Sequence, residues 1–158
     1  MTFLEHTTDP RALRHWIGNI EADYIYTNGV AAERFFQELR DHGRILGTRC
    51  PKCGTKWLPP KLFCEDCFVE TKEWVEAPAE GRVAAACVVR VDAGGNPLPR
   101  PEAWGMIRFK GFSGGFVHRL LVEPDRARSG LVVRPLLKAA GTRTGTITDI
   151  EGFVPVEG

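Results

Sequence analysis

The sequence lacks an excess of charge of either sign. Its 158 residues carry 21 lysines and arginines against 20 aspartates and glutamates, a formal net charge of +1. A protein built mainly to neutralise many nucleic-acid phosphates carries a large surplus of positive charge. The near balance therefore argues against a protein of that kind.

Long apolar runs are also missing. No stretch approaches the roughly 20 apolar residues that span a bilayer as a helix. The start, Met1 to His6, has neither the basic nor the apolar region of a signal peptide. We therefore expect a cytoplasmic protein without membrane contact. Since 43% of the residues are hydrophobic, the chain can bury a core and is not a disordered tail.

Cysteine is scarce, but four of the five cysteines lie within 18 positions. Cys50 and Cys53 form one C-x-x-C knuckle, and Cys64 and Cys67 form a second. A disulfide framework is not expected in a cytoplasmic chain, and a thioredoxin-type redox pair needs a βαβ unit that is absent here. Two knuckles supply four thiolates to one tetrahedral ion, so we predict a metal site that holds zinc, or iron adventitiously.

The predicted metal site is structural. The segment from about Arg44 to Trp74 is too short to bury a sufficient core of its own, so metal binding, worth roughly 10 to 16 kcal/mol in small sites, must order it. Closed four-sulfur coordination leaves no position for water or substrate. A catalytic role for the metal is therefore not expected.

The N-terminal part reads as two amphipathic helices. Asp9 caps a start at Pro10, and apolar residues then recur at helical spacing: Leu13, Trp16, Ile17 and Ile20. A second helix begins near residues 27–29 and ends before Gly43. Its apolar side chains, Phe35, Phe36 and Leu39, must be covered either by the rest of the chain or by a partner.

From Gly81 onward the apolar pattern has a period of two, which indicates strands. We expect five, over residues 81–91, 103–110, 116–123, 131–133 and 146–154. Five short strands favour a small barrel of the OB-fold type. Cys87 shares a strand face with the apolar residues Ala85 and Val89, so we expect a buried thiol. The Gly- and Pro-rich stretch 92–101 is either a flexible connection or a loop that orders on a partner.

Charge is uneven around the cysteines. Basic residues surround the first knuckle: Arg40, Arg44, Arg49, Lys52, Lys56 and Lys61. Acidic residues follow the second: Glu65, Asp66, Glu70, Glu73, Glu76 and Glu80. Such a ribbon can hold an anionic ligand on one side and a basic partner on the other, or simply present a solvated surface.

A known family shows the same order of elements. A helical lead-in ending in FFQELRDHGRILG is followed by TRCPKCG, a Pro59–Pro60 step with the second knuckle, and Gly81-Arg82-Val83 opening a strand. From about Val30 onward the chain resembles acyl-CoA-associated proteins that join a rubredoxin-like zinc ribbon to an OB-fold. The expected fold is mainly β with N-terminal helices: a helical segment over 1–43, the zinc ribbon over 44–76 and a five-stranded OB-fold barrel over 77–158.

The resemblance also implies a function. Such proteins form stable hetero-oligomers with a thiolase-superfamily enzyme, such as a thiolase, for example benzoylsuccinyl-CoA thiolase, or a lipid-transfer-type aldolase. They help to form its acyl-CoA site and are not catalytic alone. The four cysteines carry over as zinc ligands, and no catalytic residue carries over. We expect a coenzyme A thioester as a shared ligand, with phosphate contacts from four cations: Arg49, Lys52, Lys56 and Lys61.

Two other functions remain open from the residues. Zinc ribbons and OB-folds also bind single-stranded nucleic acid, for which Trp104, Phe109, Phe112 and Phe116 are candidate stacking residues unless they fill the barrel. Gly111–Gly115 has the letters of the G-x-S-x-G elbow of hydrolases. A strand rather than a helix is expected after it, which favours a hairpin loop. The four histidines have no acidic partner at a telling spacing.

Overall fold

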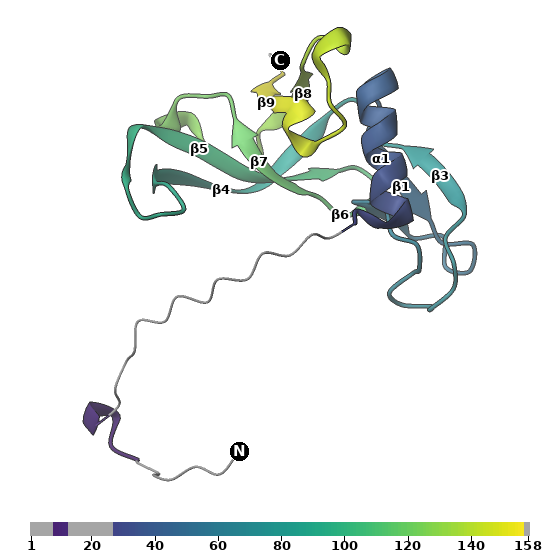
Figure 1. The fold of residues 1–158 in the computed structure, drawn as a ribbon, viewed down its shortest axis with the longest axis horizontal. Helices are drawn as coiled ribbons and strands as arrows, with labels where there is room; N and C mark the ends of the chain where they lie inside the picture. Colours follow the sequence, from purple (N-terminus) through teal and green to yellow (C-terminus); the bar gives the residue numbers. More distant parts are fainter. Residues whose placement is uncertain (1–7, 13–26, 157–158) are drawn as a thin grey trace.

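The computed structural model describes residues 8–12 and 27–156 (Figure 1). A single 3₁₀ turn, η1, spans Pro10–Ala12. The rest of the first predicted helix lies outside the described residues. The second predicted helix is present as α1, Gly29–His42.

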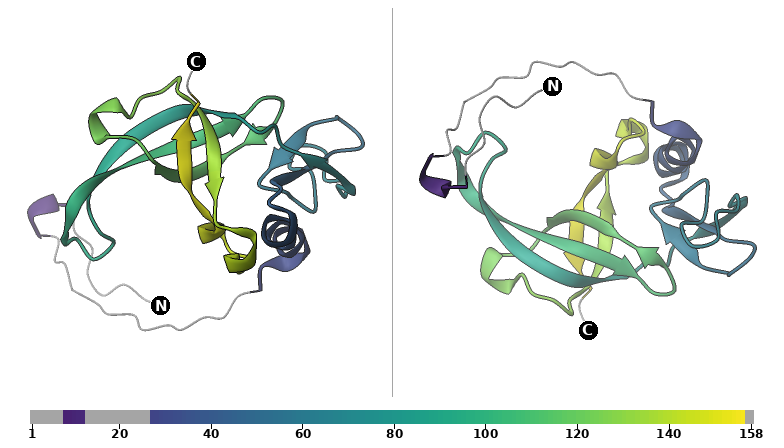
Figure 2. Two further views of the ribbon diagram at one scale, coloured as in Figure 1. Left: turned by 90° about the horizontal axis from the view of Figure 1, so that it is seen from above. Right: turned by 90° about the horizontal axis from the view of Figure 1, so that it is seen from below.

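Helix α1 ends where the sequence predicts. Gly43 has φ 67°, a left-handed conformation that glycine adopts without strain, and its N–H donates to the carbonyl of Leu39. Phe35 and Leu39 are buried, and the Phe35 ring lies 5.8 Å from that of Phe116 in the barrel. The chain itself therefore covers the apolar face of the helix. Figure 2 shows α1 where the two β units meet.

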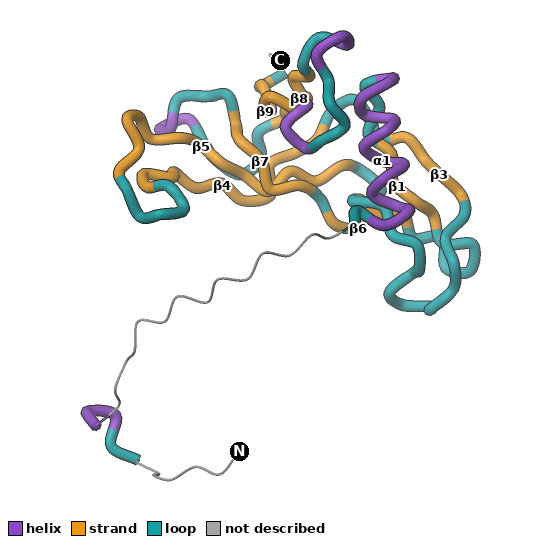
Figure 3. The backbone as a smooth tube through the Cα atoms, in the orientation of Figure 1, coloured by secondary structure: helices purple, strands orange, loops and turns teal. Residues whose placement is uncertain are grey.

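The first β unit is a small four-stranded sheet. It contains β1 (Leu46–Arg49), β2 (Lys56–Leu58), β3 (Glu73–Glu76) and β6 (Ser113–Gly114), in the order β3-β1-β2-β6. The first three strands pair antiparallel, and β6 joins β2 in parallel from a distant part of the chain. Most of the chain between β2 and β3 is loop (Figure 3).

The second β unit is a closed five-stranded barrel, as the alternating pattern predicts. Its strands are β4 (Gly81–Val91), β5 (Pro97–Phe109), β7 (Phe116–Leu120), β8 (Val132–Leu137) and β9 (Ile150–Pro155). They follow the order β4-β5-β7-β9-β8. The described residues are therefore mainly β with one α-helix, and the barrel is consistent with an OB-like fold.

The expected long loop over residues 92–101 is wrong. β5 begins at Pro97, and only a tight turn separates it from β4. A carboxylate oxygen of Asp92 accepts the N–H groups of Gly94, at 2.8 Å, and Asn96, at 2.9 Å. This local turn lets β4 and β5 continue as a two-stranded arm beyond the barrel, defined here as residues 85–91 and 97–102 (Figure 1).

The expectation that Cys87 is buried is also wrong, because Cys87 is exposed. The β4–β5 register shifts between Val83 and Ala85, which breaks the alternation that begins at Gly81. Beyond this bulge the strand runs along the arm, where no barrel interior lies behind it. Alternation therefore marks a strand here without marking a buried face.

One hydrophobic core joins the helix, the small sheet and the barrel. Leu39 comes from α1, Leu58 from β2, and Ile107 and Phe153 from the barrel, and each is at most 1% exposed. The small sheet has a second, minor cluster of only three buried residues. The sheet therefore depends on the barrel and the helix for much of its apolar contact.

Residues Gly111–Gly115 form the turn between β5 and β7, with no helix after them, as the hairpin interpretation predicts. Within it, Gly114 has φ 89°, and a side chain there would collide with the backbone oxygen of Leu58 in β2. The glycine thus permits the close parallel contact that fastens the small sheet to the barrel.

We predict that Gly114→Ala destabilises this junction by more than Gly111→Ala does. Both positions have positive φ, which costs alanine about 1 kcal/mol, but a side chain at Gly111 meets no atom within 4 Å. Urea unfolding of the two variants measures the difference, and amide exchange at β2 locates it. Equal losses of stability would contradict a role for Gly114 in the contact.

Asp149 is a fully buried carboxylate that organises the approach to β9. It accepts backbone N–H groups from Thr144 at 2.9 Å, Gly145 at 2.7 Å and Thr146 at 3.2 Å. Burial acts to raise the pKa of Asp149, but these hydrogen bonds outweigh it and hold the pKa below its ordinary value.

We predict that Asp149→Asn lowers the free energy of unfolding by about 1 to 3 kcal/mol at neutral pH, because an amide cannot accept all these donors. Since the folded pKa is depressed, the stabilisation is present above the ordinary aspartate pKa of about 3.9 and is lost as pH falls through the folded pKa. The difference in the free energy of unfolding between wild type and variant should therefore be smaller at pH 3 than at pH 7. The control is Glu151→Gln, at an exposed position, and its unfolding should match that of the wild type at both pH values.

Candidate metal centre and cationic surfaces

The two cysteine knuckles have the same backbone geometry. The N–H of Cys50 donates to the carbonyl of Thr55, and the N–H of Gly54 donates to the carbonyl of Cys50. The second knuckle repeats both bonds at the same offsets, with Val69 and Phe68 taking the places of Thr55 and Gly54. Each turn therefore presents its two thiols in the same way.

The tertiary structure brings the four sulfurs together. The Sγ atoms of Cys50, Cys53, Cys64 and Cys67 all lie within 4.8 Å of one another. The distance between Cys53 Sγ and Cys64 Sγ is 3.8 Å. A tetrahedral ion with Zn–S bonds of about 2.3 Å requires sulfur–sulfur distances of about 3.8 Å. The cysteines are thus positioned for metal binding, and their geometry fits zinc.

The surroundings of the sulfurs favour one thiolate, at Cys53, but all four cysteines can be thiolates together only if a cation is present. Backbone N–H groups of Lys52 and Cys53 each approach Cys50 Sγ at 3.4 Å. Hydrogen bonding with the side chain and backbone of Thr55 lowers the pKa of Cys53 to about 6. The neighbouring thiols, Cys53 first among them, raise the pKa of Cys67 to about 12. Four thiolates at this spacing repel one another, so a divalent cation must offset their charge.

We predict that Cys64→Ser loses the metal and opens the small sheet, because one of the four ligands is removed and the buried cluster there consists only of Trp57 and two ligands, Cys50 and Cys64. Metal content per chain and limited proteolysis of residues 50–73 report the two effects. Cys87→Ser is the matched control and should retain one metal per chain. Stoichiometric metal and wild-type resistance to proteolysis in Cys64→Ser would contradict the assignment.

The four cations proposed as phosphate contacts lie around the first knuckle and β2, but two of them have acidic partners. Arg49 Nη1 lies 3.4 Å from Glu73, and Lys61 forms an ion pair with Glu65. Lys56 Nζ lies 5.7 Å from the centre of the Phe112 ring. Within the described residues, Lys52 and Lys56 have no ion pair. The basic and acidic parts of the ribbon thus partly neutralise each other.

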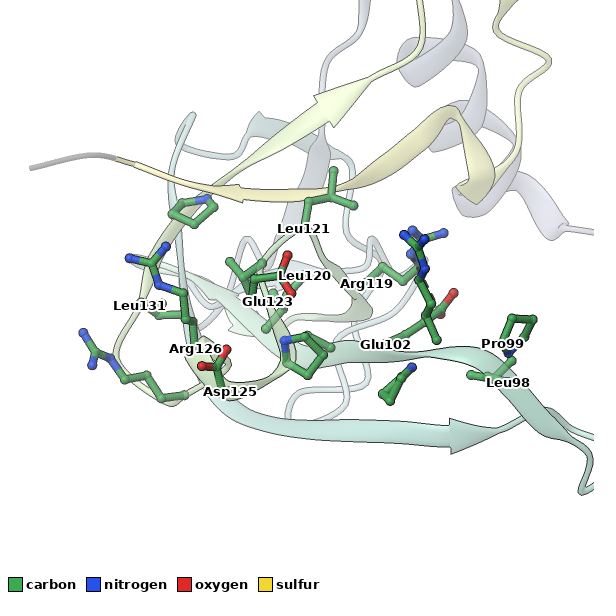
Figure 4. Close-up of a pocket in the computed structure, with 17 residues that line it drawn as sticks. Leu98, Pro99, Glu102, Arg119, Leu120, Leu121, Glu123, Asp125, Arg126 and Leu131 are labelled. Carbon is green, nitrogen blue, oxygen red and sulfur yellow. Dashed lines mark ion pairs between the residues drawn. The ribbon is translucent and has the colours of Figure 1, made fainter.

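A second cationic surface was missed by the sequence reasoning. An open groove of about 1200 Å³ lies between the start of β5, the end of β7 and the 3₁₀ turn η2, Pro124–Arg126 (Figure 4). Four arginines line it, with three acidic residues among them: Arg100, Arg119, Arg126 and Arg128, and Glu102, Glu123 and Asp125. In the sequence, only Arg126 and Arg128 lie close together. Arg100 and Arg119 come from distant segments that the barrel brings to the same groove.

The aromatic residues considered for base stacking mostly fill the interior. Phe109 and Phe116 are 3% and 6% exposed and belong to the core. Trp104 is half-buried, stacks on His118 with ring centres 6.2 Å apart, and donates its indole N–H to Glu102 at 3.0 Å. Burial lowers the pKa of His118. These rings do not form an exposed row of stacking platforms.

A four-cysteine ribbon packed on an OB-like barrel defines the class of protein. The family model described as ChsH2, rubredoxin-like zinc ribbon domain, matches residues 37–73. A crystal structure of a protein of unknown function from the DUF35 family of Sulfolobus solfataricus is 31% identical, with a TM-score of 0.60. The match covers 68% of this chain and 78% of that chain. The present chain belongs to the DUF35 family.

A second similar structure is described as the Ltp2–ChsH2(DUF35) aldolase. It is 22% identical, with a TM-score of 0.57, and the match covers 78% of this chain and 93% of that one. This likeness concerns the fold. None of the curated proteins compared with the chain matches it. In the described part of the chain, no helix is both long and apolar enough to cross a membrane.

Proposed function

We propose that this protein is a non-catalytic subunit of an acyl-CoA-processing complex. A thiolase-superfamily partner, a β-ketoacyl-CoA thiolase or a retro-aldolase, would carry the catalytic residues. The observation that carries the proposal is the joint presence of the closed four-cysteine site and the family's ribbon-and-barrel fold, which a structure described as an aldolase shares. A closed site has no coordination position left for substrate, so the metal supports structure.

Zinc would be held by Cys50, Cys53, Cys64 and Cys67. When bound, it balances the thiolate charge and crosslinks the two knuckles. This chain's own residues then keep the ribbon oriented on the barrel, through Leu58 in the common core. A rigid ribbon presents its exposed side chains to a partner at low entropic cost.

A coenzyme A thioester would be the shared ligand, with its phosphates at the first knuckle. Of the four cations Arg49, Lys52, Lys56 and Lys61, we assign the larger contribution to Lys52 and Lys56. Arg49 and Lys61 each have a carboxylate partner that reduces their attraction for phosphate. The arginine groove of Figure 4 is the other cationic surface on which a phosphate could lie.

We expect this chain to copurify with the thiolase-like protein encoded beside it when the two are co-expressed. The expected complex survives size-exclusion chromatography and turns over acyl-CoA faster than the partner alone. The enzyme without this subunit is the control. Absence of a complex, together with full activity of the partner alone, would refute the proposed function.

Within that complex, we expect the double variant Lys52→Ala/Lys56→Ala to raise the KM for acyl-CoA about tenfold, the loss expected for charge-assisted hydrogen bonds to phosphate. The matched control, Arg126→Ala/Arg128→Ala, removes the same charge from the groove. If the control alone raises the KM, the phosphate site lies in the groove and the first-knuckle assignment is wrong.

A further inference from the structure

The arm formed by β4 and β5 has one edge that the described residues leave unpaired. β4 pairs with β8 only at Gly81 and Arg82. Val83 then exchanges hydrogen bonds with the backbone of Leu131 and Gly130. From Ala85 to Val91, no described strand pairs with this edge. A two-stranded ribbon on its own is marginally stable in water.

The two edges of the arm differ in how they are protected. The edge of β5 carries three prolines, Pro97, Pro99 and Pro101, which cannot donate hydrogen bonds to an added strand. The edge of β4 from Ala85 to Val91 contains no proline and a single charge, at Arg90. The sequence thus blocks strand addition on one edge of the arm and permits it on the other.

Alternate residues of β4 direct their backbone N–H and C=O groups to opposite edges of the strand, and the structure shows which residues face the unpaired edge. Val83 directs its N–H and C=O toward the 130–131 segment. The bulge that follows inserts one residue, after which the carbonyl of Ala85 faces β5, since a side chain at Gly105 would lie 3.1 Å from its oxygen. Ala86 and Val88 therefore direct their N–H and C=O groups to the unpaired edge.

The sequence of this edge is complementary to itself. In antiparallel pairing centred on Cys87, Ala86 of one copy lies opposite Val88 of the other, and Ala85 lies opposite Val89. Small side chains thus face large ones, and Arg90 does not meet its own copy. Ala86 and Val88 are also the residues whose backbone groups point outward, so this register aligns donors with acceptors.

We propose that two copies of this chain associate by antiparallel pairing of their β4 edges around Cys87. The two arms then form one four-stranded sheet across a twofold axis. The exposed apolar side chain of Val88, which is 37% exposed, gains cover along the new sheet. The occupant is a second copy because the register is self-complementary. The proposal does not depend on the acyl-CoA function or on a partner enzyme.

Sedimentation velocity of the zinc-loaded full chain over a concentration series tests this proposal. We expect a dimer of twice the 17.6 kDa chain mass. Val88→Pro removes an outward N–H while leaving the β4–β5 hydrogen bonds intact, so it should raise the dimer dissociation constant about tenfold or more, since two hydrogen bonds are lost per dimer. Val88→Thr keeps the N–H and the branched side chain, and should dimerise like wild type.

Cross-linking locates the contact without a change in the strand. Opposed residues in such a pair lie about 4.5 Å apart at Cα, so a short bis-maleimide should join the two Cys87 thiols, and Cys87→Ser should abolish the product. A chain that stays monomeric at all concentrations would overturn the proposal. A dimer that lacks the Cys87 cross-link and tolerates Val88→Pro would also overturn it, because its contact lies elsewhere.

Discussion

Repulsion among four closely spaced sulfur atoms, and its compensation by a cation, determine whether the ribbon is ordered. Its own buried cluster consists of Cys50, Trp57 and Cys64, so two of its three members are themselves part of the sulfur site. Apolar burial of that size cannot order the long loops between β2 and β3. The thiols sit at the spacing of a tetrahedral site and need a cation to ionise together. Order in the ribbon therefore follows from metal binding.

The barrel holds the ordered ribbon in a fixed position relative to the rest of the molecule. Ile45 and Leu58 from the ribbon enter the same core as Leu39 of the helix and Phe153 of the barrel. The short strand β6 adds a backbone contact across the junction, which Gly114 makes sterically feasible. A ribbon tied at several points moves with the barrel, and the pair can act as one shaped surface against another protein.

The surfaces of the ribbon and barrel differ in their charge and in whether they present an unpaired strand edge. Ion pairs such as Arg49 with Glu73 join the basic and acidic parts of the ribbon, so the opposite charges there partly neutralise each other locally. Among the described residues, Lys52 and Lys56 at the first knuckle have no ion pair. In the arginine groove Arg119 pairs with Glu102, and the other three arginines have no ion pair within the described part of the chain. The arm adds a surface of another kind, where backbone hydrogen-bonding groups rather than charges are available. These surfaces and the four-cysteine site are the features on which the proposed role in an assembly rests.

Features that depend only on neighbouring residues could be predicted from the amino-acid pattern. C-x-x-C spacing predicted the metal cluster, Gly43 the end of α1, and a period of two the five barrel strands. Features made by segments far apart in the chain needed the tertiary structure: the parallel contact of β6 with β2, the arginine groove and the ion pairs of the proposed phosphate residues. Cys87 shows the reason most clearly. Its alternation with apolar neighbours indicates a strand, but burial depends on what packs against that strand, and beyond the bulge after Val83 no barrel interior does.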